Sequence, residues 1–332
     1  MTTIKRVAQH AGVSITSVSH AINHPNRVSD TMRRRVEKAI EELGYHPNPT
    51  AQNLRTGRTN LIALLIPDIC NPFYPELVQV IQTQVSRVGL DTLIFNTDVP
   101  GNLSGTHMTE YLSQIGQNRF DGVIVASEAL VGHEHVLEDL DLPAVYIGHL
   151  SEPIIDNVTI DDFAAAYMAT EYLIKKGHQR IAHISGEPKF FAGKQRQQGY
   201  EKALLDHDLA VYPNYIYAGT FLRPAGREGI RVLLTQPAPP TAVFIANSQM
   251  AIGALATLSD MGKQVPEDIA IVTFDDIAEM EDIRPTLTTI DYSPRLIAHH
   301  AIQLLFERLE GTTPDPPRSI RVPFSLLKRN SA

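Results

Sequence analysis

The sequence predicts a small all-α head with a helix-turn-helix unit, followed by a two-lobed α/β body. Three short amphipathic patterns fill residues 1–46, and from residue 61 onward apolar strand-like runs alternate with helical stretches. The alternation is too long for one sheet, which indicates two lobes. Residues 1–60 carry nine Lys or Arg against four Asp or Glu, whereas the whole chain carries a net −8. A basic head on an acidic body indicates that only the head meets a polyanion, although a solvated Arg-rich helix would give the same charge.

Composition narrows the class of protein. A chain of 332 residues suits two or three domains, and 43% hydrophobic residues are typical of a globular protein. The apolar run Leu61–Pro67 is far shorter than the ~20 residues that span a bilayer, and the chain opens without a secretory pattern. The single cysteine, Cys70, excludes an internal disulfide and fits a reducing compartment. We therefore expect a cytoplasmic protein without a membrane partner.

Two short helices joined through a glycine form the predicted helix-turn-helix. Thr3 can cap the first helix, which Gly12 ends, and Ser14 can cap a second helix over Ile15–Asn23. The apolar face of the first helix is formed by Ile4, Val7, Ala8 and Ala11. A third helix follows the cap residue Ser29 and ends at Gly44, with an apolar stripe of Met32, Val36, Ile40 and Leu43. Three helices around one core make a complete DNA-reading module, although a generic three-helix bundle would show the same pattern.

The second helix is expected to read DNA bases. Val18 and Ala21 lie on its inner face. The outward face carries Thr16, Ser17 and His20, whose side chains can form hydrogen bonds with base edges in the major groove. We assign contacts to the DNA backbone to four further residues of the head: Ser14, Ser19, Asn23 and Tyr45.

The body alternates strands and helices in the way that is typical of parallel sheets covered on both faces. The candidate strands are Leu61–Ile66, Thr92–Asn96, Gly122–Ala126, Ala144–Ile147, Arg180–Ile184, Ala242–Ala246, Ile269–Phe274 and a final strand Ile320–Leu327. Ligands of such sheets sit outside the carboxyl ends of the strands. The polar and aromatic candidates near those ends are Asp68, Asn71, Phe73, Asn96, Asp98, Ser127, Phe190, Phe191, Arg196, Phe221, Asn247, Ser248 and Asp275. Each taken singly is more often a helix cap, a turn residue or a core residue.

Catalytic motifs do not occur at the spacings that their chemistry requires. Gly186 and Gly193 are separated by six residues rather than the four of a phosphate loop, and Gln195 stands where that loop needs Ser or Thr. His133-Glu134-His135 lacks the zinc-protease spacing, and no Gly-x-Ser-x-Gly elbow is present. We therefore expect neither an enzyme nor a bound metal or cofactor. A transport-type binding protein is the other alternative, but it would need a secretory signal and would have no DNA-reading head.

The head carries a dense set of motif residues. They are Thr3-Ile4-Lys5-Arg6-Val7-Ala8, Ala11-Gly12-Val13-Ser14, Val18-Ser19-His20-Ala21-Ile22-Asn23, Val28-Ser29 and Glu42-Leu43-Gly44-Tyr45-His46-Pro47-Asn48. With these motifs the chain resembles the lac/galactose repressor family of transcriptional regulators, and the resemblance continues through the rest of the chain. Much of that family has Arg where this chain has His20, a departure that resembles the purine-repressor branch. The resemblance implies a repressor that binds a palindromic double-stranded DNA operator and responds to a small effector.

Residues 47–60 are predicted to form a hinge between the head and the body. Asn48 is a good N-cap, but a helix of about eight residues is marginal in water, and a plain linker is the simpler alternative. The resemblance implies a hinge helix that orders on DNA. There Leu54 would wedge between base pairs in the minor groove, with Ala51 and Arg55 beside it.

For the body, residues 61–332, the resemblance implies the type I periplasmic-binding-protein architecture, in which the chain crosses three times between the lobes. We place the crossovers near Ile160, Asp291 and Val322, and expect the helix Pro294–Leu309 to return to the first lobe. The first lobe then comprises about residues 61–160 and 292–322, and the second about 161–291 and 323–332.

The resemblance also selects effector-binding residues from the candidates. The selected residues are Phe73, Phe190, Arg196, Phe221, Asn247, Ser248 and Asp275. Phe190 is apolar where the purine-repressor branch uses Arg, and Ser248 stands where the family commonly has Asp. The loss of that carboxylate removes a two-acceptor clamp for vicinal hydroxyls. We expect a small polar ring compound, in the first place a sugar and alternatively a nucleobase, and either sign of its effect on DNA binding.

We expect a two-fold homodimer, because one helix-turn-helix reads only a few base pairs. The candidate interface is an apolar edge of the helix after Pro72, which comprises Pro75, Glu76, Leu77, Val80, Ile81 and Gln84. Such a stripe is equally typical of a core face. Tetrameric members of the family carry an extra C-terminal heptad helix, and because the chain ends at Ala332 without one, we expect no tetramer.

Overall fold

The computed structural model divides the chain into two compact units, Met1–Thr59 and Asn60–Ala332. The residues that the structure describes are 2–45, 58–97, 106–117, 120–126, 135–138, 140, 142–150, 152, 154–312 and 316–332. Several candidates lie outside these ranges: Ala51, Leu54 and Arg55 of the predicted hinge, and Asp98, Ser127, His133 and Glu134 of the body. Within the described ranges, no helix is long and apolar enough to cross a membrane.

The head packs three helices around a small core. They are α1 (Ile4–Ala11), α2 (Ile15–Asn23) and α3 (Asp30–Leu43), with a 3₁₀ turn at Pro25–Arg27. Val7, Val18 and Val36, one from each helix, are almost fully buried where the helices meet. This arrangement is the helix-turn-helix unit that the sequence predicts.

The ends of the head helices are set by single residues. Gly12 and Gly44 end α1 and α3 in the left-handed region, with φ of 63° and 55°, which glycine adopts without a Cβ clash. The hydroxyls of Ser14 and Ser29 accept hydrogen bonds from the first turns of α2 and α3, as predicted. Thr3 is the N-cap residue of α1 as predicted, but its hydroxyl accepts no hydrogen bond from the helix; the N–H groups of Arg6 and Val7 donate to its carbonyl.

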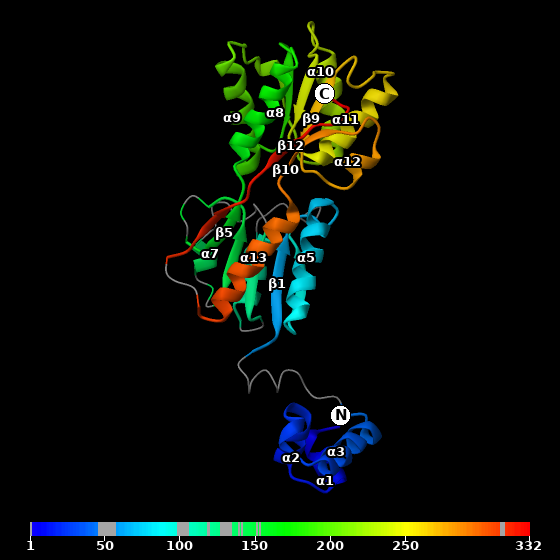
Figure 1. The fold of residues 1–332 in the computed structure, drawn as a ribbon, viewed down its shortest axis with the longest axis vertical. Helices are drawn as coiled ribbons and strands as arrows, with labels where there is room; N and C mark the ends of the chain where they lie inside the picture. Colours follow the sequence, from blue (N-terminus) through cyan, green and yellow to red (C-terminus); the bar gives the residue numbers. More distant parts are fainter. Residues whose placement is uncertain are drawn as a thin grey trace. The chain divides into compact units, whose positions relative to one another are not determined.

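The first lobe of the body is a six-stranded parallel sheet in the order β11-β5-β4-β3-β1-β2. Its strands are β1 (Leu61–Ile66), β2 (Asp91–Asn96), β3 (Gly122–Val125), β4 (Ala144–Ile147), β5 (Asp156–Thr159) and β11 (Ser319–Arg321). Its described helices are α5 (Phe73–Arg87), α6 (Thr106–Ile115), α7 (His135–Glu138) and α13 (Pro294–Leu309). Leu64 of β1 faces the core under α5 and α13, and its neighbour Leu65 faces the core under α6. Helices α5 and α13 lie side by side next to β1 (Figure 1).

The second lobe repeats this plan with the strand order β12-β10-β9-β8-β6-β7. Its strands are β6 (Ile181–Ser185), β7 (Ile216–Ala218), β8 (Ala242–Ile245), β9 (Ala270–Phe274), β10 (Thr288–Asp291) and β12 (Ser325–Leu327), the last antiparallel to β10. Its described helices are α8 (Asp162–Lys175), α9 (Phe191–Asp206), α10 (Arg223–Leu234), α11 (Ser248–Asp260) and α12 (Glu279–Asp282). Phe244 of β8 packs toward α8 and α9, whereas Val243 packs toward α10 and α11.

The chain passes between the two lobes at the three predicted places (Figure 1). β5 of the first lobe leads into α8, β10 of the second lobe leads into α13, and β11 leads into β12. The single final strand predicted over Ile320–Leu327 is wrong, because the chain changes sheets within it. Pro323 lies at this break and has no N–H to donate to either sheet.

Strand prediction from apolar runs found β1, β2, β3, β4, β6, β8 and β9 to within one residue at each end and missed β5, β7 and β10. Of the missed strands, β5 and β10 carry Asp, Asn or Thr side chains, and β7 has only three residues. Their polar residues are buried by position in the sheet, which no local pattern records. Of the proposed interface edge of α5, Leu77 and Ile81 are fully buried core residues of their own lobe, whereas Pro75 is exposed and Glu76, Val80 and Gln84 are partly exposed.

Candidate DNA interface and effector cleft

The predicted base-reading residues lie on the outward face of α2. Thr16 is exposed, while Ser17 and His20 are partly exposed on the side opposite the buried Val18. The Ser17 hydroxyl lies 2.9 Å from the Ser14 hydroxyl, so part of its hydrogen-bonding capacity is used within the turn. The geometry presents a polar helix face of the kind that enters a major groove.

The residues assigned to the DNA backbone have unequal surroundings. Ser14 is exposed but serves as the cap of α2, and Ser19 is partly buried. Tyr45 is only 9% exposed, because its ring belongs to the core of the head. The side chain of Asn23 lies outside the described part of the structure. Tyr45 can therefore reach a phosphate only with its hydroxyl edge.

Arg196 of α9 is the buried cation of the body. Its Nε donates to Asp162 Oδ1 at 2.8 Å, its Nη1 donates to the Ala246 carbonyl at 2.5 Å, and its guanidinium lies 3.6 Å from the Phe274 ring centroid. Burial opposes the charge, but Asp162 and Asp275 outweigh burial and raise the pKa of Arg196 above its usual value. Among the described residues its Nη2 has no partner, so this nitrogen is available to a ligand.

Asp275 follows β9 and is held by two donors. The Tyr292 hydroxyl donates to Asp275 Oδ1 at 2.5 Å, and the Ser248 backbone N–H donates to the same carboxylate. Burial raises the pKa of Asp275, and the nearby Arg196 and Tyr292 act in the opposite direction. Asp275 has a left-handed backbone with φ of 71°, which costs energy in a residue with a Cβ and places the carboxylate beyond the strand end.

Phenylalanine rings surround this polar cluster. Phe221 also has a positive φ of 63°, and its ring rests on Gly186, where a Cβ atom would lie only 1.9 Å from it. The Phe190 ring lies 6.5 Å from Phe221, tilted by 31°. Phe73 of the first lobe packs against the cores of both lobes and lies 5.5 Å from the Tyr292 ring. Flat apolar faces therefore line a site whose polar groups come from Arg196 and Asp275.

Asn247 and Ser248 are built into the start of α11. Asn247 Oδ1 accepts from the Met250 N–H as the helix cap, and Asn247 Nδ2 donates to the Phe221 carbonyl at 2.9 Å. The Ser248 hydroxyl is fully buried and has no hydrogen-bond partner among the described residues. A buried hydroxyl without a partner is costly unless a ligand or water satisfies it.

Two residues of this cluster were not among the sequence candidates. Arg196 and Asp275 share the cluster, but the direct ion pair of Arg196 is with Asp162, which was not a candidate, and neither was Tyr292. Asp162 stands two residues after the predicted crossover at Ile160, and Tyr292 directly follows the crossover at Asp291. A search of the positions next to the crossovers, as well as the strand ends, would have selected both Asp162 and Tyr292.

Two contacts join the lobes next to the Arg196 cluster. The His149 ring, after β4 of the first lobe, stacks on Phe191 of α9 with 3.8 Å between centroids and 6° between planes. Arg321 of β11 donates to Asp161, the cap residue of α8, at 2.8 Å. Both contacts depend on the angle between the lobes.

The two units match known protein families. A model for "Bacterial regulatory proteins, lacI family" matches residues 3–48, and a model for "Periplasmic binding protein-like domain" matches residues 170–332. The HTH-type transcriptional repressor CytR of Escherichia coli (strain K12) is 34% identical over 93% of this chain and 90% of its own length. This chain belongs to the lacI family of bacterial regulatory proteins.

Other proteins of this kind are similar along nearly the whole chain. The repressor PurR of Yersinia pestis (strain Pestoides F) is 33% identical, covering 100% of this chain and 97% of its own. The lac repressor dimer bound to operator and an anti-inducer has a TM-score of 0.85 at 25% identity, covering 99% of this chain and 98% of that one. The complex of the regulator CelR with cellobiose has a TM-score of 0.74 at 30% identity, with both chains fully covered.

The lacI-family assignment confirms the predicted fold class, a helix-turn-helix head on a two-lobed body like periplasmic binding proteins. The chain is a sequence-specific DNA-binding transcriptional regulator under the control of a small effector. The curated relatives are transcriptional regulators rather than enzymes.

Proposed function

We propose that this chain is a transcriptional repressor whose affinity for a palindromic DNA operator is set by a sugar bound between the lobes. The observation that carries the proposal is the buried cluster of Asp162, Arg196, Asp275 and Tyr292 beside the phenylalanine faces. Sugars present hydroxyls around an apolar ring face, and carboxylates, a guanidinium and stacked rings recognise both features.

The hydrogen-bonding atoms of the cluster that lack a partner among the described residues suit the hydroxyl groups of a sugar. Arg196 Nη2 is a free donor among the described residues, Asp275 retains acceptor sites beyond its two donors, and the Ser248 hydroxyl lacks a partner there. Ser248 in place of a carboxylate leaves one fewer acceptor pair for vicinal hydroxyls. The proposal therefore favours a sugar bound mainly through the Arg196 and Asp275 side.

A nucleobase is the second candidate, because the rings of Phe190 and Phe221 could enclose a flat heterocycle. Phe190 offers no charge or hydrogen bond to such a ligand, and this favours the sugar.

Each function is assigned to one part of the chain. In the proposal, residues 1–46 bind DNA in the cytoplasm, residues 47–60 form the hinge, and residues 61–332 bind the effector and form a homodimer. Similarity to a lac repressor dimer bound to its operator supports this division. A change in the angle between the lobes would alter the spacing of two hinges and so the affinity for DNA. The chain has no expected catalytic role.

A thermal-shift screen of the full-length chain tests the effector class. Sugars, nucleosides and nucleobases are added separately, and a ligand that binds the folded chain raises its Tm according to its concentration relative to Kd. We expect a sugar to give the largest rise and to change operator affinity in a fluorescence anisotropy titration. A rise with nucleobases alone would favour the second candidate. No rise with any of these compounds would contradict both.

A further inference from the structure

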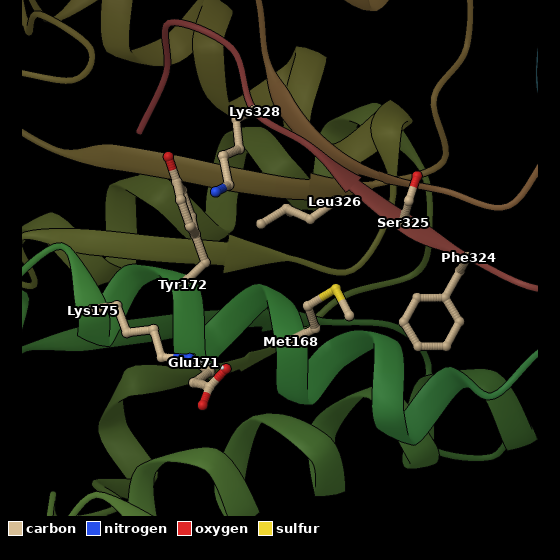
Figure 2. A pocket seen from close by; sticks show the side chains of 8 residues that line it. All are labelled: Met168, Glu171, Tyr172, Lys175, Phe324, Ser325, Leu326 and Lys328. Atoms are coloured by element: carbon tan, nitrogen blue, oxygen red, sulfur yellow. Dashed lines mark ion pairs between the residues drawn. The ribbon is translucent and has the colours of Figure 1, made fainter.

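The second lobe has a hollow that shares no residue with the effector cleft (Figure 2). Its volume is about 400 Å³, which lies within the range of small-molecule sites. One wall is a single face of α8, which carries Met168, Glu171, Tyr172 and Lys175 at helical spacing. The other wall is the edge strand β12 and its flanks, with Phe324, Leu326 and Lys328.

The middle of the hollow is apolar. α8 already buries Ala165 and Ala169 against the sheet, yet Met168 on its other face remains 37% exposed. Phe324 and Tyr172 are half-buried on either side of the hollow. Figure 2 shows Met168, Leu326 and Phe324 around one open space. This surface can bind an apolar group of modest size.

The charged rim favours an anion. Lys175 pairs with Glu171 at 2.7 Å, whereas Lys328 has no carboxylate within ion-pair distance among the described residues and lies 5.5 Å from the Tyr172 ring centroid. Lys176 lies over the same ring at 5.4 Å. The residues that line the hollow carry two ammonium groups, Lys175 and Lys328, and one carboxylate, Glu171, which Lys175 pairs with. An incoming anion would therefore find a cation beside an aromatic ring.

The hollow also connects two of the three crossovers. α8 begins directly after the first crossover, and Phe324 lies in the third, two residues after the buried Val322. The Val322 N–H donates to Thr159 in the first lobe, so the third crossover is bonded to one lobe while Phe324 faces the other. A ligand that contacts both Phe324 and α8 would respond to the angle between the lobes.

We propose that this hollow is a second effector site, which takes a small aromatic carboxylate. Its ring lies among Met168, Phe324 and Tyr172, and its carboxylate pairs with the Lys328 ammonium. Because the site contacts α8 and the third crossover, its occupancy changes the affinity of the head for DNA. By linkage, operator DNA changes the affinity for the carboxylate by the same factor.

Calorimetric titration of the full-length protein tests this site with three probes: benzoate, phenylacetate and 3-phenylpropionate. Phenylacetamide serves as the neutral control. Lys328→Gln removes the charge at an exposed position, and we expect it to weaken carboxylate binding about tenfold while phenylacetamide binding stays the same. Met168→Trp fills the hollow and should abolish binding of all four compounds. Lys176→Gln is the matched control, because that ammonium contacts the same ring but does not line the hollow.

Operator titrations with and without the best probe complete the test. We expect the probe to shift operator affinity in the wild type and in Lys176→Gln, and to have no effect in Lys328→Gln or Met168→Trp. Absence of binding by all three carboxylates, equal binding to wild type and Lys328→Gln, or binding without any shift in operator affinity would overturn the proposal. A sugar response that persists in Met168→Trp would show that the two sites are separate.

Discussion

At the scale of single residues, the proposed effector site depends on one buried cation. Arg196 uses two of its donor atoms on Asp162 and the Ala246 carbonyl and keeps its plane against Phe274. This geometry requires a flat, forked group, which a lysine ammonium cannot supply even though it carries the same charge. Removing the charge altogether would leave Asp162 and Asp275 buried without compensation.

Replacing Arg196 by Lys should therefore separate effector binding from folding. The charge is kept, so the body should still fold, but the fork to Asp162 and to the ligand is lost, and effector affinity should fall at least about tenfold. Isothermal titration and operator anisotropy measure the two effects. Arg180→Lys is the matched control, since Arg180 only donates to the Pro239 carbonyl at the surface. Unchanged effector affinity in Arg196→Lys would move the site elsewhere.

His20 is the residue of the head whose replacement should change base preference. It lies partly exposed on the outward face of α2, with its ring 6.2 Å from His24. Arginine is longer and forms paired bonds with guanine, so His20→Arg should alter discrimination at one position per half-site by about 1–3 kcal/mol. Selection of binding sites from a random DNA library gives the consensus sequences of the wild type and the variant. If they are identical, His20 reads no base.

At the scale of elements, the contact between the loop after β4 and the start of α9 sets the arrangement of the lobes. The parallel stack of His149 on Phe191 joins the first lobe to the helix that carries Arg196. Burial lowers the pKa of His149, Arg321 of β11 lowers it further, and Asp162 of α8 opposes them. The stacked arrangement thus prefers the neutral imidazole.

This preference predicts a pH dependence with a definite sign. A histidine whose folded pKa is lowered contributes fully above the usual value of 6.5, and its contribution is lost as the pH falls below that value. His149→Phe keeps a stacked ring that does not titrate. We therefore expect the Tm of the variant relative to wild type to be higher at pH 5.5 than at pH 7.5. An equal difference at both values, measured by calorimetry, would show that His149 does not couple to the lobes.

Elements were predictable from the sequence where local patterns decide them. The helix ends at Gly12 and Gly44 and the caps at Ser14 and Ser29 follow from backbone and hydroxyl chemistry within one turn. The strand β5 could not be predicted from its own residues. It begins with Asp156, whose carboxylate is buried and forms ion pairs with Arg308 and Arg318 from distant parts of the chain. A sequence window contains none of those partners.

At the scale of the whole molecule, the edge strand β2 is a further candidate for the dimer interface. Leu93 and Ile94 are 47% and 38% exposed, on opposite faces of this strand, and Val88 before it is 57% exposed. Edge strands that expose large apolar side chains pair readily with another chain. On the predicted edge of α5, Leu77 and Ile81 are covered by their own lobe, and Pro75 and Val80 stay available to a partner.

Leu93→Lys should weaken the dimer. A charge buried in an apolar interface has no partner, so the variant should dissociate into single chains at a higher protein concentration than wild type. Because Leu93 lies on an edge strand, the lobe itself should still fold. Sedimentation at micromolar concentration without DNA should give about 73 kDa for wild type, twice the 36.7 kDa chain, and a shift toward one chain for the variant. Met261→Lys, at an exposed methionine of the second lobe, is the control. A wild-type species near four chains would contradict the dimer.

The crossovers and the choice of Phe73, Asn247 and Asp275 came from the resemblance to the lac/galactose repressor family. The sequence alone determined the division into a basic helical head and an acidic α/β body and most of the strand ends. These depend on periodicity, caps and charge, which are local properties of the chain. Only the tertiary structure decided that Arg196 pairs with Asp162, that Tyr292 holds Asp275, and that His149 meets Phe191. Those partners are 34, 17 and 42 positions apart in the chain, and they meet because two sheets built from interleaved segments bring crossovers and strand ends to the same place.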